Sequence, residues 1–167
     1  MRYGIALGSN VGDRLGHLSK ARRLLLALSD APDTALFSPV FESAPVDCAT
    51  GTAAFLNAVA ELSLPFPPAE LLLRCQQIER DFGRAESRLP NSPRQLDLDI
   101  LYAGELVIDS ADLIVPHPRI TQRRFVLQHL AAIRPDLRLP GFDQSVSQLQ
   151  NSLDSDEPPL QLVADEW

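Results

Sequence analysis

The chain has 167 residues, of which 45% are hydrophobic, so it is long and apolar enough for one domain with a proper core. Its formal net charge of −7 argues against general nucleic-acid binding, and no apolar run approaches the ~18 residues of a membrane span. Cys48 and Cys75 are too few and too far apart for a disulfide framework or a metal-binding set, which is the cysteine usage of a cytoplasmic protein.

The charge is unevenly distributed along the chain. Residues 154–167 contain five acidic residues and no Lys or Arg, so we expect a domain over residues 1–150 and an acidic tail over residues 151–167. Residues 74–94 and 119–138 each contain five Arg, whose planar guanidinium groups bind phosphate oxygens through paired hydrogen bonds. These two segments are candidate polyphosphate-binding surfaces.

Hydrophobic patterning predicts three strands and one helix in the first part of the chain. The expected strands span residues 3–7, 34–42 and 55–64, and the expected helix spans residues 13–30. Pro39 favours a sheet edge or a bulge for the second strand. Small residues at 43–54 form a long loop before the third strand, whose core-facing side consists of Leu56, Ala58, Ala60 and Leu62.

A second helix is expected over residues 65–82. Proline stands in its first turn, apolar residues follow at helical spacing, and Gly83 ends it. Residues 84–93 have no hydrophobic period and contain two prolines, so they form a second long loop.

The strongest functional pattern lies in residues 94–101. Apolar residues alternate there with Asp97 and Asp99, so the two carboxylates share one face of an extended strand. Their Cα atoms would lie roughly 6.5–7 Å apart, because a strand rises about 3.3 Å per residue, and both could reach one cation or cation pair. Such oxygen ligands suit Mg²⁺. An edge strand with a solvated acidic face is the simpler alternative, and the arginines nearby favour the metal site.

Beyond this strand, apolar patterning predicts a short strand over residues 106–108 and a helix over residues 125–133. Up to residue 101, the element order is strand, helix, strand, strand, helix, strand. This is the split βαβ order of a ferredoxin-like α+β fold, an antiparallel β-sheet with flanking helices on one face and further elements added after the fourth strand. The two long loops, 43–54 and 84–93, lead into the strands with polar faces, so we expect them to cover an active site.

Five motifs together resemble one enzyme family. They are G-S-N-x-G-D at 8–13, F-L-N-A at 55–58, G-R at 83–84, N-x-P-R-x-L-D-L-D-I-L at 91–101 and V-P-H-P-R-x-x-x-R-x-F-V-L at 115–127. In this order and near this spacing, they resemble the 6-hydroxymethyl-7,8-dihydropterin pyrophosphokinase family of folate biosynthesis, over residues 3–138. The ferredoxin-like α+β fold of that family agrees with the element order above.

The resemblance implies an ATP-dependent diphosphotransferase. Such an enzyme moves the diphosphate of ATP to the hydroxymethyl group of a reduced pterin and leaves AMP. The resemblance further implies two Mg²⁺ ions on Asp97 and Asp99, which would neutralise charge and position the reacting oxygens. It places Arg84 and Arg94 on the polyphosphate as the other catalytic residues, where fixed guanidinium groups stabilise the transferring group.

The resemblance also implies two sets of binding residues. The ATP-binding positions are Gln76, Arg84, Arg88, Arg94, Ile100, His117 and Arg123. The pterin-binding positions are Ser43, Ala44, Val46, Phe55, Asn57, Asp97 and Phe125. The two phenylalanines would lie on either side of the pterin ring, with Asn57 at its edge. Taken singly, most of these residues would have a structural explanation, so the assignments depend on the resemblance.

Two other classes of function stay open. A two-metal phosphohydrolase would use the same carboxylates and arginines with water as the nucleophile, but it would leave Asn57 without a role. An inactive, regulatory ferredoxin-like module that binds a small molecule would have lost its metal ligands, whereas both aspartates are present. We expect a monomer that binds ATP and a reduced pterin and has no nucleic-acid or membrane partner.

Overall fold

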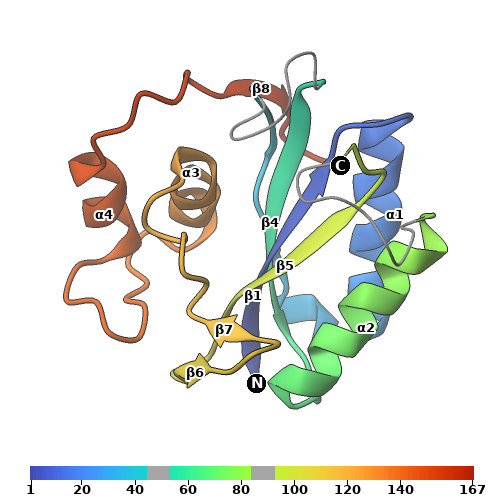
Figure 1. Ribbon diagram of the computed structural model, residues 1–167, viewed down its shortest axis with the longest axis horizontal. Coiled ribbons are helices and arrows are strands. Elements are labelled where there is room, and N and C mark those ends of the chain that lie inside the picture. The colour runs from blue at the N-terminus through green and yellow to red at the C-terminus, as the bar shows by residue number, and fades with distance from the viewer. Residues whose placement is uncertain (45–52, 84–92) are drawn as a thin grey trace.

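The computed structural model describes residues 1–44, 53–83 and 93–167 (Figure 1). In chain order its elements are β1 (Arg2–Ser9), α1 (Arg14–Ala27), the 3₁₀-helix η1 (Pro32–Thr34), β2 (Leu36–Phe37), β3 (Val40–Ser43), β4 (Phe55–Ser63), α2 (Pro68–Asp81), β5 (Asp97–Ala103), β6 (Ile108–Asp109), β7 (Ile114–Val115), α3 (Arg124–Ile133), α4 (Val146–Ser152) and β8 (Gln161–Ala164). Within these described ranges, no helix is long and apolar enough to cross a membrane.

The main sheet is antiparallel, in the order β5-β1-β4-β3-β8, with β2 also paired to β4. The first and third predicted strands, β1 and β4, lie side by side in the middle, and the second and fourth lie outside them. This is the arrangement that a ferredoxin-like fold requires. The predicted α+β fold with an antiparallel sheet is therefore confirmed.

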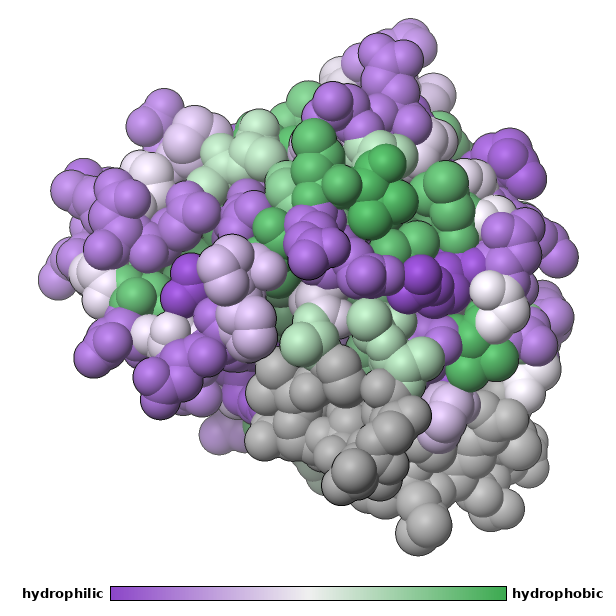
Figure 2. Space-filling model, turned by 90° about the horizontal axis from the view of Figure 1, so that it is seen from above, coloured by the Kyte–Doolittle hydropathy of each residue, from purple (hydrophilic) through white to green (hydrophobic). Residues whose placement is uncertain are grey.

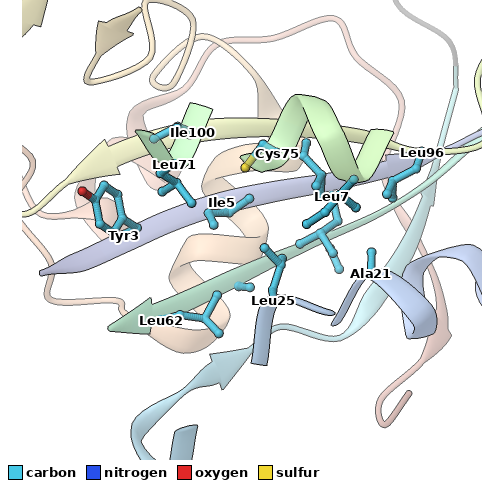
Figure 3. Close-up of a cluster of buried hydrophobic side chains, with 14 of the residues drawn as sticks. Tyr3, Ile5, Leu7, Ala21, Leu25, Leu62, Leu71, Cys75, Leu96 and Ile100 are labelled. Atoms are coloured by element: carbon cyan, nitrogen blue, oxygen red, sulfur yellow. The ribbon is translucent and has the colours of Figure 1, made fainter. Parts of the chain in front are cut away.

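Helices cover both faces of the sheet (Figure 1). On one face, α1 and α2 bury an apolar cluster that includes Ile5, Leu7 and Leu71 (Figure 3). On the other face, α3 packs against the sheet and contributes to a second apolar cluster, which includes Val59 of β4 and Leu127 of α3. Helix α4 packs against α3. The elements after the fourth strand thus cover the second face, because residues such as Val59 make that face apolar as well.

Local signals determine where α1 and α2 end. Asp13 caps α1, and its carboxylate accepts a hydrogen bond from the N–H of Gly16 at 3.1 Å. Gly83 follows α2 with φ at +85°, a left-handed conformation that glycine adopts without steric cost. Both helices therefore lie where the sequence predicts them.

The predicted strand over residues 34–42 is divided into β2 and β3 at Ser38 and Pro39. Proline cannot donate to a neighbouring strand, and Ser38 bonds Val59 through both its backbone and its side chain. The N–H of Ser38 donates to the Val59 carbonyl at 2.9 Å, and the N–H of Val59 donates to Ser38 Oγ at 2.9 Å. The predicted interruption is confirmed, and it keeps β3 paired with the start of β4.

The last residues add an edge strand to the sheet, because β8 pairs with β3. The indole N–H of Trp167 donates to the carbonyl oxygen of Ser38 at 2.8 Å. Its ring meets the Phe37 ring edge-on, with centroids 5.9 Å apart. The segment in which acidic residues suggest a tail, 151–167, therefore contacts the sheet through its apolar residues.

Candidate active site

A cavity of about 90 Å³ lies where the last part of β1 meets the first residues of β4 and β5. Figure 2 looks down onto this end of the molecule and shows hydrophobic residues beside hydrophilic ones. The lining comes from the sheet, from the first turn of α3 and from the segment before β8: Ala6, Leu7, Gly8, Ser43, Ala44, Phe55, Asn57, Arg94, Asp97, Asp99, Arg123, Phe125, Glu157, Pro158 and Leu160. The fold thus brings together residues from both halves of the chain.

The described part of the predicted pterin set lies in this cavity. Its members there are Ser43, Ala44, Phe55, Asn57, Asp97 and Phe125. Strand pairing accounts for part of this arrangement, because Ser43 at the end of β3 lies opposite Phe55 at the start of β4. Arg94, Asp99 and Arg123, predicted to act on the phosphates and metal, line the same cavity.

Asn57 is held in one orientation. Its side chain is buried, and Nδ2 donates a hydrogen bond to Ser43 Oγ at 2.7 Å. A Cβ atom on Gly8 would lie 3.2 Å from Asn57 Oδ1 and 3.8 Å from the Phe55 ring. Glycine at this position therefore keeps the amide oxygen and the ring open to a ligand.

Each of the two cavity aromatics lies near a guanidinium group. The Cζ atom of Arg94 is 5.9 Å from the centre of the Phe55 ring, and that of Arg123 is 5.6 Å from the centre of the Phe125 ring. These are cation–π distances. The cavity therefore combines two flat apolar surfaces with two cations.

His129 is a buried neighbour of two cavity residues. Its Nε2 lies 2.8 Å from the carbonyl oxygen of Asn57, and its Nδ1 contacts the carbonyl oxygen of Phe125. The ring also meets Phe125 and Phe41 edge-on, with centroids 6.3 and 5.2 Å apart. Burial lowers the pKa of His129, and its backbone hydrogen bonds oppose that shift. His129, which no sequence motif indicated, ties α3 to β4 beside the cavity.

The two predicted metal ligands lie on one face of β5, as the period of two in the sequence requires. Pairing with β1 puts Asp97 opposite Gly8 and Asp99 opposite Ala6, and both aspartates line the cavity. Nη1 of Arg94 lies 3.0 Å from Oδ1 of Asp97. The ion pair brings a predicted phosphate ligand and a predicted metal ligand into contact.

The backbone of Arg94 is fixed by Asn10, at the end of β1. The N–H of Arg94 donates to Asn10 Oδ1 at 2.8 Å, and the N–H of Asn10 donates to the Arg94 carbonyl at 3.1 Å. Asn10 is only 3% exposed, so solvent does not compete for these bonds. The Asn of the G-S-N motif therefore positions the backbone of Arg94.

Within residues 1–44, 53–83 and 93–167, no three His, Cys, Asp or Glu side chains are grouped to hold a metal ion. Asp97 and Asp99 alone nevertheless suit Mg²⁺. This ion commonly binds one or two carboxylates and takes its other ligands from water and substrate phosphates.

A second hollow shares Asp99 with the cavity. Its lining combines apolar and polar residues from α2, β5 and the chain around β7: Leu72, Leu98, Asp99, Ile100, Ser110, Ala111, Asp112, Leu113, Ile114, His117 and Pro118. Two predicted ATP-binding positions, Ile100 and His117, lie here. The predicted ATP residues are therefore divided between two neighbouring hollows joined at Asp99.

His117 has a defined hydrogen-bonding state in this hollow. Its Nδ1 accepts the N–H of Arg119 at 3.1 Å, so Nε2 carries the proton of the neutral ring. Burial lowers its pKa, Arg123 and Arg119 lower it further, and Asp97 opposes them. The side chain is thus a neutral N–H donor near neutral pH.

Four predicted positions are either absent from the lining of the two hollows or outside the described residues. Gln76 is exposed on α2 and lines neither hollow. Val46, Arg84 and Arg88 lie outside the described residues. These four positions therefore stay predictions.

Glu157, Pro158 and Leu160 line the cavity, although the sequence motifs assign them no role. They belong to a segment whose proline and acidic content suggested a tail. One feature of the sequence could have indicated that this segment joins the sheet. Leu160, Leu162 and Val163 form a short, mostly apolar stretch, which with Trp167 after it is compatible with an edge strand.

Comparison with known proteins shows the family of this chain. The family model "7,8-dihydro-6-hydroxymethylpterin-pyrophosphokinase (HPPK)" matches residues 4–135. Two bacterial relatives are named 2-amino-4-hydroxy-6-hydroxymethyldihydropteridine pyrophosphokinase. The Bacillus subtilis protein is 43% identical over 129 residues, covering 77% of this chain and 75% of the relative. The Pseudomonas aeruginosa protein is 41% identical over 141 residues, covering 83% and 84%.

The chain also matches part of some larger proteins. A folate synthesis bifunctional protein of Arabidopsis thaliana is 42% identical over 126 residues, so the match spans 75% of this chain but only 25% of that relative. A Plasmodium falciparum HPPK-DHPS structure has the same fold, with a TM-score of 0.65 at 14% identity over 90% of this chain and 42% of that one. The resemblance seen in the motifs is therefore confirmed, and the chain belongs to the 7,8-dihydro-6-hydroxymethylpterin-pyrophosphokinase family.

Proposed function

We propose that this protein transfers the diphosphate group of ATP to the hydroxymethyl group of 6-hydroxymethyl-7,8-dihydropterin. The products are AMP and the pterin diphosphate, in tetrahydrofolate biosynthesis. One observation carries the proposal: a single cavity gathers the aromatic, amide, cationic and carboxylate positions that the motifs imply. Membership of the family, with two bacterial relatives that carry the activity in their names, supports it.

The pterin ring would bind between flat apolar surfaces and a polar edge. Phe55 and Phe125 supply the surfaces, since aromatic rings favour stacking on a flat heterocycle. Asn57 supplies Oδ1 as an acceptor for a ring N–H, and its bond to Ser43 fixes the amide before the ligand arrives. Ala44 and Asp97, which line the cavity, and Val46 complete the proposed pterin set.

The phosphates would bind beside that ring. Arg94 and Arg123 line the cavity, and fixed guanidinium groups there stabilise charge that develops on the transferred group. Asp97 and Asp99 would hold two Mg²⁺ ions, which would neutralise phosphate charge and lower the barrier to attack at the β-phosphorus. Arg84 and Arg88 stay in the proposed phosphate set.

The second hollow suits the nucleoside part of ATP. Apolar residues of its lining, among them Leu72 and Ile100, can contact a flat base. Because Asp99 lines both hollows, a nucleotide bound there would direct its phosphates past Asp99 into the cavity. The neutral Nε2–H of His117 can donate to a phosphate oxygen on that path.

We also propose that the protein acts as a monomer in the cytoplasm. Cys75 is buried and burial raises its pKa to about 12, which is typical of a structural thiol. Sedimentation at several protein concentrations would test the monomer.

The direct test is AMP formation from ATP and Mg²⁺, with and without the pterin, with the second product identified by mass. We expect pterin-dependent AMP and an equal amount of pterin diphosphate. Phosphate or diphosphate release without pterin would instead indicate a two-metal phosphohydrolase. Pterin binding without turnover would indicate a regulatory binding module.

A further inference from the structure

The segment between α4 and β8 runs along the cavity. Residues 153–160, here called the crossing segment, pass from one face of the sheet to its edge strand (Figure 1). Glu157, Pro158 and Leu160 of this segment line the cavity. The segment lies outside residues 4–135, the part that matches the family model. One wall of the proposed pterin site is therefore built by residues beyond the family motifs.

Both ends of the crossing segment are anchored. Before the cavity, Nη2 of Arg124 donates to the carbonyl oxygen of Ser155 at 2.9 Å. Within the segment, the N–H of Glu157 donates to Ser155 Oγ at 3.2 Å. After the cavity, β8 pairs with β3, and Trp167 donates to Ser38 at 2.8 Å. These contacts hold the wall in place before a ligand binds, and residues of a binding site need such support.

Glu157 is placed next to the proposed pterin residues. Its Oε2 accepts the backbone N–H of Arg124 at 3.1 Å, and Arg124 lies between Arg123 and Phe125 in the chain. Its other oxygen, Oε1, makes no hydrogen bond to the described residues. One carboxylate oxygen is therefore committed to the start of α3, and the other is left to meet a ligand in the cavity.

The charge and hydrogen-bonding capacity of the Glu157 carboxylate determine which part of the substrates it can bind. A carboxylate accepts hydrogen bonds and carries negative charge, so it repels a polyphosphate and attracts N–H donors. A reduced pterin presents adjacent donors, the 2-amino group and N3–H, on the ring edge. Of the cavity carboxylates, Asp97 and Asp99 are assigned to the metal ions, and Asp97 also to the pterin set. Glu157 is the cavity carboxylate that has no assigned role so far.

We infer that Glu157 is a specificity-determining residue, which accepts a hydrogen bond from the 2-amino edge of the pterin ring through Oε1. This inference rests on the proposed function. Glu157 selects a ring with an exocyclic amino group, while Phe55 and Phe125 bind any flat ring of that size. The same carboxylate caps α3, so recognition of the ring is linked to the placement of Phe125.

The experiment compares Glu157→Gln with the wild-type protein. Glutamine keeps an acceptor for the Arg124 N–H and removes the charge. Asp156→Asn is the matched control, because Asp156 is an exposed neighbour that does not line the cavity. Two probes are titrated calorimetrically with a non-hydrolysable ATP analogue and Mg²⁺ present: 6-hydroxymethyl-7,8-dihydropterin, and its analogue with hydrogen in place of the 2-amino group.

We expect Glu157→Gln to weaken binding of the pterin about tenfold, the loss of one charge-assisted hydrogen bond, and to leave the amino-free analogue and the ATP analogue unchanged. An unchanged pterin affinity would overturn the inference. Equal weakening of both probes, with a lower melting temperature, would also overturn it, because it would show that Glu157 only caps α3. Failure of the wild-type protein to bind the pterin would instead overturn the proposed function.

Discussion

The Phe125→Ala variant tests the proposed pterin site most selectively. Phe125 lies in the first turn of α3, where its ring lines the cavity beside the Arg123 guanidinium, at 5.6 Å. The helix itself is anchored by Val126, Leu127 and Leu130, which are buried in the second core. The substitution therefore removes one ring from the cavity and leaves the helix in place.

The expected loss follows from the stacking energy of one ring. An aromatic ring stacked on a base contributes about 1–3 kcal/mol, which corresponds to a dissociation constant about 5 to 150 times larger. Calorimetric titration with the pterin should show this loss, and titration with a non-hydrolysable ATP analogue should show almost none. Phe142→Ala is the matched control, because Phe142 is 37% exposed and does not line the cavity. Equal losses for pterin and nucleotide would refute the assignment of Phe125 to the pterin.

Three further predictions concern the carboxylates, the G-S-N motif and pH. Asp97→Asn should lower turnover about 10²–10³-fold in the AMP assay with unchanged circular dichroism, because it removes charge at the reacting phosphates. Asn10→Ala should lower the free energy of unfolding by about 1–3 kcal/mol in urea titrations, because the part-buried N–H of Arg94 loses its acceptor. Burial lowers the pKa of His129, so in acid the unfolded chain takes up a proton that the folded chain does not, and stability falls as pH drops below about 6.5. His129→Gln should therefore lose less stability than the wild-type protein between pH 7 and pH 5.

Each of these predictions has a clear contrary result. Turnover near the wild-type rate in Asp97→Asn would remove the metal role of that residue. Asn10→Asp keeps the acceptor, so it should retain more stability than Asn10→Ala, and the reverse order would contradict the role given to Asn10. An identical loss of stability with acid in His129→Gln and wild type would show that His129 is not the group responsible.

Much of the fold follows from patterns that span a few residues. The period of two at Asp97 and Asp99 predicted a strand with both carboxylates on one face, and the structure has them so. Asp13 and Gly83 marked the ends of two helices for local steric and hydrogen-bonding reasons. These features depend only on near neighbours in the chain, which is why the sequence alone reveals them.

The features that sequence patterns did not reveal depend on distant contacts. The pairing of β8 with β3 is supported by the Trp167 indole bond to Ser38, 129 residues away. His129 bonds the carbonyl of Asn57, 72 residues away, and its own neighbours in the sequence give no sign of this. Glu157 belongs to the same class, since its acidic surroundings suggested a tail. Such contacts exist only once the sheet is formed.

The fate of each phosphate of ATP tests the central claim most directly. In a single turnover with excess protein, Mg²⁺ and pterin, ATP carrying a label at the β-phosphorus should transfer that label to the pterin, and a label at the α-phosphorus should stay on AMP. This result would establish attack at the β-phosphorus, as a diphosphate transfer requires. Recovery of the β-label in ADP, or in free phosphate or diphosphate, would contradict the proposed function.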